Sequence, residues 1–164
     1  MRIDIRPAEI SDIEDMSRVV DSCWRENFKD IFTLEQIERY TGEPRRSSFR
    51  KLLSDGKFIY ILLIDGIISA VCAGESCEEK LFRDCVKVIL LYVAPEKQRN
   101  GNGKKLLMYS LREFRKKGFK CAVLETAELN ENARKFYEKF GFSEQKSAAR
   151  EFEGIKYVTY KIDF

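Results

Sequence analysis

The residues with the clearest capacity for chemistry form a short turn, Gln98–Gly103, with the sequence Gln-Arg-Asn-Gly-Asn-Gly. Two glycines one residue apart let a ligand approach the backbone closely. The preceding segment, Val86–Val93, is largely β-branched and aliphatic and predicts a buried strand, and an amphipathic helix is expected beyond the glycines. Backbone N–H groups and the positive end of a helix dipole would therefore point outward, beside Lys104 and Lys105. The turn predicts a site for a phosphate or pyrophosphate.

Two familiar phosphate-binding patterns fit this turn poorly. The P-loop ends in Gly-Lys-Ser/Thr, but here Lys105 stands in the hydroxyl position and Gln98 in that of the first glycine. The Rossmann pattern needs a third glycine where Leu106 stands, although Glu125 lies at about the right distance to bind a ribose. A dinucleotide site therefore stays open, as does a turn without a ligand, which would leave the flanking cations unexplained.

A second motif spans Asn130–Phe142, and another amphipathic helix is expected over Asn130–Phe140. It fits the pattern Asn-x-x-Ala-x-x-apolar-Tyr-x-x-x-Gly-Phe at every position. The turn Gln98–Gly103 fits Gln/Arg-x-x-Gly-x-Gly/Ala. In this order, with one expected strand between them, the two motifs resemble those of the GNAT superfamily of N-acetyltransferases. The resemblance covers Val86–Phe142, whereas Arg2–Ala73 agrees with that family only in the order of its elements.

The resemblance implies transfer of the acetyl group of acetyl-CoA to a primary amine, by direct attack in a ternary complex. The pyrophosphate would bind the turn, the pantetheine arm would pair with the end of the preceding strand, and the second motif would contact the reactive end. The implied cofactor-binding residues are Leu91, Tyr92, Val93, Gln98, Arg99, Asn100, Gly101, Asn102, Gly103, Lys104, Asn130 and Tyr137. Asn102 departs from the family pattern, which usually has an aliphatic residue between the two glycines.

The same chemistry requires proton transfer at two places. The resemblance implies that Tyr137 meets the CoA sulfur and protonates the departing thiolate. The amine must also lose a proton, since a lysine-like amine has a pKa of about 10.4. The chain contains no histidine, so the base is a carboxylate, Tyr, Cys, Lys or water. Glu125 and Glu75, each at the end of an expected strand, are the candidates, and a water relay stays open beside them.

A second function is compatible with the same resemblance, namely an acetyl-CoA-binding sensor or interaction module without catalysis. No motif indicates the acceptor, so a small-molecule amine, a protein N-terminus and a lysine side chain all stay open. The aromatic residues within Trp24–Phe32 either pack in the core or line the acceptor pocket, and core packing is favoured for any single one of them. A homodimer is compatible with the resemblance.

Hydrophobic periodicity and turn signals indicate the elements that must position these residues. Asp65-Gly66 predicts a hairpin turn, and the capping-box patterns Ser11–Glu14 and Thr33–Gln36 predict two helix starts. The expected strands are Arg2–Arg6, Phe58–Ile64, Ile67–Ala73, Val86–Val93, Cys121–Leu124 and a terminal pair after Phe142. This order predicts a single-domain α/β (α+β) fold with a mixed, mostly antiparallel central sheet flanked by helices. The resemblance adds a splay between the two central strands.

Bulk properties limit the class of protein. A length of 164 residues suits one domain over residues 1–164. The net charge of +3 is too small to indicate nucleic-acid binding. No apolar run approaches the length of a membrane span, and residues 1–6 lack the apolar core of a signal peptide. We therefore expect neither a nucleic-acid partner nor a membrane.

The cysteines point to a reducing, cytoplasmic setting. There are five of them, and their odd number and irregular spacing argue against a disulfide framework. Cys72, Cys85 and Cys121 lie in or beside apolar strand-like runs, where each is expected to be a small hydrophobic free thiol. Without histidine the common Cys/His zinc sites are unavailable, so no metal is expected.

Overall fold

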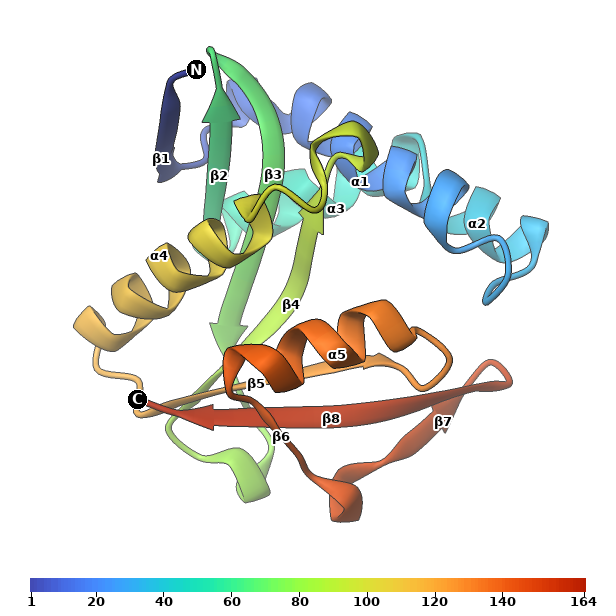
Figure 1. Cartoon of the computed structure of the whole chain (residues 1–164), viewed down its shortest axis with the longest axis vertical. Coiled ribbons are helices and arrows are strands. Elements are labelled where there is room, and N and C mark those ends of the chain that lie inside the picture. The colour runs from blue at the N-terminus through green and yellow to red at the C-terminus, as the bar shows by residue number, and fades with distance from the viewer. The chain divides into compact units, whose positions relative to one another are not determined.

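The computed structural model describes residues 1–164 as two compact units (Figure 1). The first unit comprises residues 1–74 and 90–110, and the second comprises residues 75–89 and 111–164. The chain passes between them more than once, so that strands β3 (Ile67–Ser76) and β4 (Cys85–Val93) and helix α4 (Asn102–Lys116) each contribute residues to both units.

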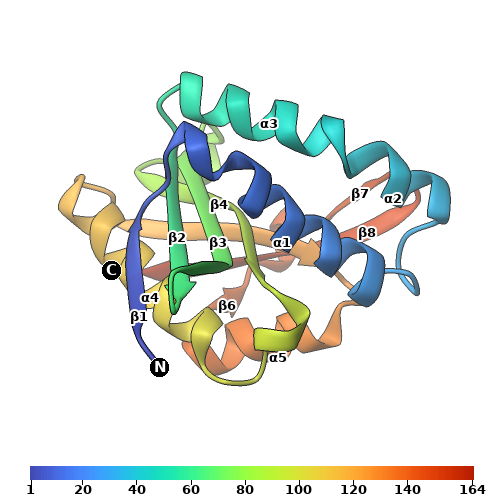
Figure 2. The ribbon, with the colours of Figure 1, turned by 90° about the horizontal axis from the view of Figure 1, so that it is seen from above.

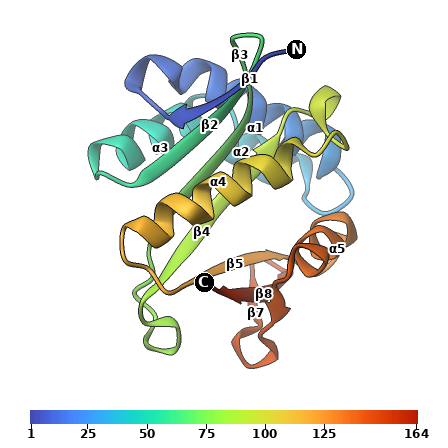
Figure 3. The same ribbon diagram turned by 60° about the vertical axis from the view of Figure 1, so that its left-hand side comes forward.

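In the first unit, strands β1 (Ile3–Pro7), β2 (Phe58–Ile64) and β3 form an antiparallel meander (Figure 3). The turn between β2 and β3 has positive φ at both central residues, 50° at Asp65 and 82° at Gly66. Asp and Gly tolerate this conformation, which matches the twist of the strands it joins. The hairpin predicted from Asp65-Gly66 is therefore confirmed.

Three helices complete the first unit: α1 (Ile13–Asn27), α2 (Leu34–Tyr40) and α3 (Glu43–Ser54), with α1 and α3 side by side (Figure 2). Thr33 and Gln36 form the predicted capping box at the start of α2. The expected start of α1 at Ser11 is wrong. A 3-10 turn, η1 (Ile10–Asp12), comes first, and there the Asp12 carboxylate accepts from the Glu9 N–H at 2.8 Å. Glu9 and Asp12 form the capping box of this turn, and α1 begins only at Ile13, after it.

In the second unit, β4 pairs in parallel with β5 (Cys121–Ala127) from Cys85 to Val88. Strand β8 (Ile155–Asp163) pairs antiparallel with β5 and with the short strands β6 (Ser143–Glu144) and β7 (Arg150–Phe152). Helix α5 (Glu131–Phe140) and two 3-10 turns, η2 (Lys80–Phe82) and η4 (Lys146–Ala148), lie between the strands in the chain.

The strand order is β1-β2-β3-β4-β5-β8-β6, with β7 paired to β8. The ladder β4–β5 is parallel, and five other ladders are antiparallel. The expected mixed, mostly antiparallel sheet of an α/β fold is therefore confirmed. The single domain over residues 1–164 and the splay between the central strands stay predictions. None of the helices is both long enough and apolar enough to cross a bilayer.

One prediction about the cysteines is wrong, because Cys85 and Cys121 form a disulfide. They are directly opposite in the parallel register of β4 and β5, and their Cα atoms lie 4.4 Å apart. This is within the range that a disulfide spans. Both cysteines are buried, with Phe82 and Val123 around them. Cys72 is the free, buried thiol that was expected.

Candidate functional site

The turn before α4 presents backbone donors. After the 3-10 turn η3 (Pro95–Lys97), Arg99 and Gly101 adopt left-handed conformations, with φ of 62° and 76°. Residues 99–101 are exposed, and α4 starts at Asn102. Its first backbone bond runs from Lys105 N to Gly101 O, at 3.0 Å. The N–H groups at positions 102–104 precede that bond and have no acceptor within the helix, which is the arrangement that binds anions.

Two side-chain amides of the same turn bond to the protein's own backbone. Gln98 Nε2 donates to the Val93 carbonyl oxygen, and Asn102 Nδ2 donates to that of Lys97, both at 2.9 Å. The Asn102 residue is only 3% exposed. These two positions therefore shape the turn with their side chains. A ligand would meet the backbone N–H of Asn102, whereas that of Gln98 donates to the Pro95 carbonyl oxygen.

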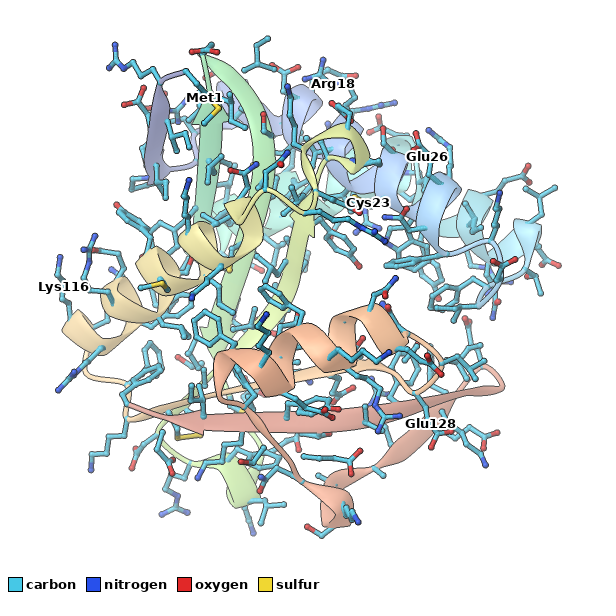
Figure 4. All side chains as sticks on the ribbon, viewed as in Figure 1. Met1, Arg18, Cys23, Glu26, Lys116 and Glu128 are labelled. Carbon is cyan, nitrogen blue, oxygen red and sulfur yellow. A yellow bond between two sulfur atoms is a disulfide. The ribbon has the colours of Figure 1, made fainter.

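The end of β4 is joined to helix α1 by two neighbouring contacts. The Cys23 thiol, labelled in Figure 4, donates to the Val93 carbonyl oxygen at 3.0 Å, so this oxygen accepts two hydrogen bonds. Trp24 Nε1 donates to the Tyr92 hydroxyl at 3.2 Å. Burial raises the pKa of the Cys23 thiol to about 12. The thiol therefore stays protonated at neutral pH and serves as a donor, not as a nucleophile.

An aromatic cluster surrounds Trp24 in the first unit. The Trp24 ring stacks on Phe32, with centroids 4.8 Å apart, and contacts Phe28 and Tyr40 at 5.5 and 5.6 Å. The Arg45 guanidinium lies 5.5 Å from the ring centroid. Trp24 thus packs against four neighbours while staying half-buried, so a place in the wall of the acceptor pocket stays open for it. The roles of Tyr40 and Arg45 were missed because only the fold brings them to α1.

Helix α5 and its N-cap carry two of the predicted site residues of the second unit, Tyr137 and Asn130. The Asn130 side-chain oxygen caps the helix by accepting from Ala133 N at 3.2 Å. Tyr137 is 9% exposed, and its ring packs on Phe142 and Tyr160 at centroid distances of 5.6 and 6.2 Å. The Asn130 cap therefore uses only the carbonyl side of the amide, and Tyr137 is held by aromatic packing.

Glu125, the first candidate base, lies between two cations of the second unit. Its Oε1 is 3.4 Å from Lys87 Nζ, and its Oε2 is 2.6 Å from Arg150 Nε. The Arg150 guanidinium also lies 5.1 Å from the centroid of the Tyr157 ring. The Glu125 side chain is 15% exposed, so the pairs are shielded from water on one side. Glu75, the second candidate, is half-buried near the end of β3.

The family model described as the acetyltransferase (GNAT) family matches residues 16–142, more than half of the chain. The chain therefore belongs to this family and is an acetyltransferase. A related protein, the spermidine N(1)-acetyltransferase of Thermoplasma acidophilum, is 27% identical over 154 residues, which cover 93% of this chain and 95% of that one.

Solved structures of family members share the fold. PaiA N-acetyltransferase from Thermoplasma acidophilum, in complex with coenzyme A, aligns with a TM-score of 0.83 at 20% identity over 100% of both chains. A putative acetyltransferase from Salmonella typhimurium with its cofactor acetyl-CoA aligns with a TM-score of 0.73 at 17% identity, over 99% of this chain and 94% of that one. The chain thus has the GNAT fold, in agreement with the two sequence motifs.

Proposed function

We propose that this protein transfers the acetyl group of acetyl-CoA to a primary amine, by direct attack in a ternary complex. The observation that carries the proposal is the turn before α4, where exposed residues in left-handed conformations precede N–H groups without helical acceptors. A pyrophosphate carries the charge and the oxygen acceptors that such a turn binds. Relatives solved with coenzyme A and acetyl-CoA support this choice of ligand.

The cofactor would be held along its length by the residues that the resemblance implies. Backbone N–H groups of Arg99–Lys104 take the pyrophosphate, and the Asn130 amide donates nearer the thioester. The pantetheine arm pairs with backbone at Leu91–Val93, which lies beyond the last residue of the β4–β5 ladder, Val88. The Val93 carbonyl oxygen already accepts from Gln98 and Cys23, so we assign it no part in binding pantetheine.

The reaction forms a bond between the amine nitrogen and the acetyl carbon and breaks the bond from that carbon to the CoA sulfur. One proton leaves the nitrogen, and one reaches the thiolate. We assign the second transfer to the Tyr137 hydroxyl. A thiol pKa of roughly 8.5 makes the thiolate a fair leaving group, so this acid assists the reaction without being indispensable.

We assign the first transfer to Glu125, directly or through a water molecule, with Glu75 as the alternative. Glu125 can take this role once its pair with Arg150, at 2.6 Å, is loosened. Arg150 lies on β7, a strand of three exposed residues that pairs with β8. Its side chain is 49% exposed and therefore has solvent to move into.

We propose a small amine of the polyamine type as the acceptor, ahead of a protein N-terminus or lysine. A relative that matches nearly the whole length of the chain is named a spermidine N(1)-acetyltransferase. We also place the enzyme in the cytoplasm. Cys23, Cys72 and Cys77 are free thiols, while burial shields the Cys85–Cys121 disulfide from reductants.

The test is a panel of amines supplied with acetyl-CoA, followed by thiol release and by the mass of the product. We expect release with spermidine and related diamines, and a product heavier by one acetyl group. Release with peptides alone would overturn the proposed acceptor. Tight binding of acetyl-CoA without turnover on any amine would instead identify a sensor or interaction module.

A further inference from the structure

The turn before α4 contains a buried side-chain hydrogen bond, and the residue that donates it departs from the family pattern. Asn102 stands between the two glycines, where the family usually has an aliphatic side chain. Its amide nitrogen donates to the Lys97 carbonyl oxygen at 2.9 Å, and the residue is 3% exposed. A buried polar group at a position that suits an aliphatic one needs a specific partner, and here it has one.

This bond closes the turn on itself. It joins the last residue of η3 to the first residue of α4, so that residues 98–101 form the loop between its two ends. A second side-chain bond, from Gln98 Nε2, ties the start of the same loop to the Val93 carbonyl oxygen. Arg99 and Gly101, in left-handed conformations, are thus held between two fixed points.

We propose that Asn102 is a positioning residue, which pre-organises the turn for the pyrophosphate of the cofactor. A loop already held in its binding conformation loses less conformational entropy when the ligand arrives. An aliphatic side chain can fill the same space but cannot donate to Lys97, and it leaves that carbonyl without this partner. The inference rests on the proposed function, because it names what shapes that site.

The substitution Asn102→Leu tests the proposal with two acetyl donors. Acetyl-CoA carries the pyrophosphate, whereas S-acetyl-pantetheine lacks it. Loss of one buried hydrogen bond should raise the KM for acetyl-CoA and the Kd for CoA by roughly tenfold. We expect kcat to stay unchanged, and kcat/KM with S-acetyl-pantetheine to stay unchanged as well. A general loss of structure would lower the activity with both donors.

A matched control is available in Gln145, whose Nε2 donates to the Ser143 carbonyl oxygen at 3.1 Å in an exposed position. Gln145→Ala removes the same kind of bond outside the turn and should leave both donors unaffected. Asn102→Ala is the second variant if the leucine disturbs packing. The proposal is overturned if either soluble variant binds CoA like the wild type, or loses both donors equally. A wild-type protein that fails to bind CoA would contradict the proposed function itself.

Discussion

At the scale of single residues, the positions proposed for catalysis differ in how far their surroundings fix their roles. Tyr137 sits in an aromatic environment of Phe136, Phe142 and Tyr160, which fixes the ring. Glu125 instead contacts two cations, Lys87 and Arg150. The acid role of Tyr137 and the base role of Glu125 can therefore be tested separately.

Replacing Tyr137 with phenylalanine should lower kcat by about tenfold or more, because general-acid assistance to the thiolate is lost. The ring and its packing are retained, so the Kd for acetyl-CoA should change little. The steady-state rate of thiol release gives kcat, and titration calorimetry gives the Kd for acetyl-CoA. An unchanged kcat would remove Tyr137 from the acid role.

For Glu125, the informative comparison is Glu125→Gln with Arg150→Gln. The first removes the proton acceptor and should lower kcat on all amines by about a hundredfold. The second removes one partner cation and leaves the carboxylate, so activity should persist. The kcat values of both variants, measured over a pH series, check this. Similar losses in the two variants would show that the ion pair, and not the base, is what the enzyme needs.

At the scale of elements, one ion pair stabilises the turn that precedes α1. The Asp12 carboxylate accepts from Arg6 Nη1 at 2.7 Å and Nη2 at 2.9 Å, and also from the Glu9 N–H. Hydrogen bonds from Arg6 hold the pKa of Asp12 below its ordinary value of 3.8. The pair thus ties the last turn before α1 to strand β1.

This pair should make the free energy of unfolding decrease at acidic pH. A carboxyl whose pKa is lower in the folded state stabilises the fold at pH values above its unfolded pKa. The contribution, about 1–2 kcal/mol at neutral pH, is lost as the pH falls through 3.8 toward the folded pKa. Urea unfolding of the wild type and of Asp12→Asn, from about pH 3 to about pH 7, measures this contribution. These limits lie on either side of the ordinary pKa of an Asp carboxyl. Curves with the same pH dependence in both proteins would contradict the assignment.

At the scale of the whole molecule, the Cys85–Cys121 disulfide joins β4 to β5 across 36 residues of sequence. The chain between them includes the glycine turn before α4 and all of α4. Such a cross-link restricts the unfolded chain far more than it alters the folded one. The disulfide is therefore expected to stabilise the second unit, to which both cysteines belong.

Replacing both cysteines with alanine should lower the free energy of unfolding by about 3–4 kcal/mol, from the chain-entropy model for a loop of this length. Urea titration of the variant, with Cys72→Ala as a free-thiol control, measures the loss. The KM for acetyl-CoA should be unchanged where both proteins are folded. Equal stability of oxidised wild type and double variant would show that the disulfide does not contribute.

The sequence by itself determined what depends on neighbouring residues. The Asp65-Gly66 turn, the Thr33–Gln36 capping box, the glycine turn before α4 and the helix in Asn130–Phe142 are each set by local conformational preferences and short spacings. These features were enough to predict the mixed sheet and the family. Ser11 shows the limit, because bonds from Arg6 and the Glu9 N–H to Asp12 set a 3-10 turn ahead of α1.

Only the tertiary structure decided which distant side chains meet. The register of β4 on β5 places Cys85 opposite Cys121, although the odd number of cysteines argued against a disulfide. The β7–β8 hairpin brings Arg150 to Glu125, 25 residues away. The fold also buries Asn102 and directs its side-chain amide to the Lys97 carbonyl oxygen. Burial and strand register arise from the cooperative packing of the whole chain, and no short segment of sequence contains them.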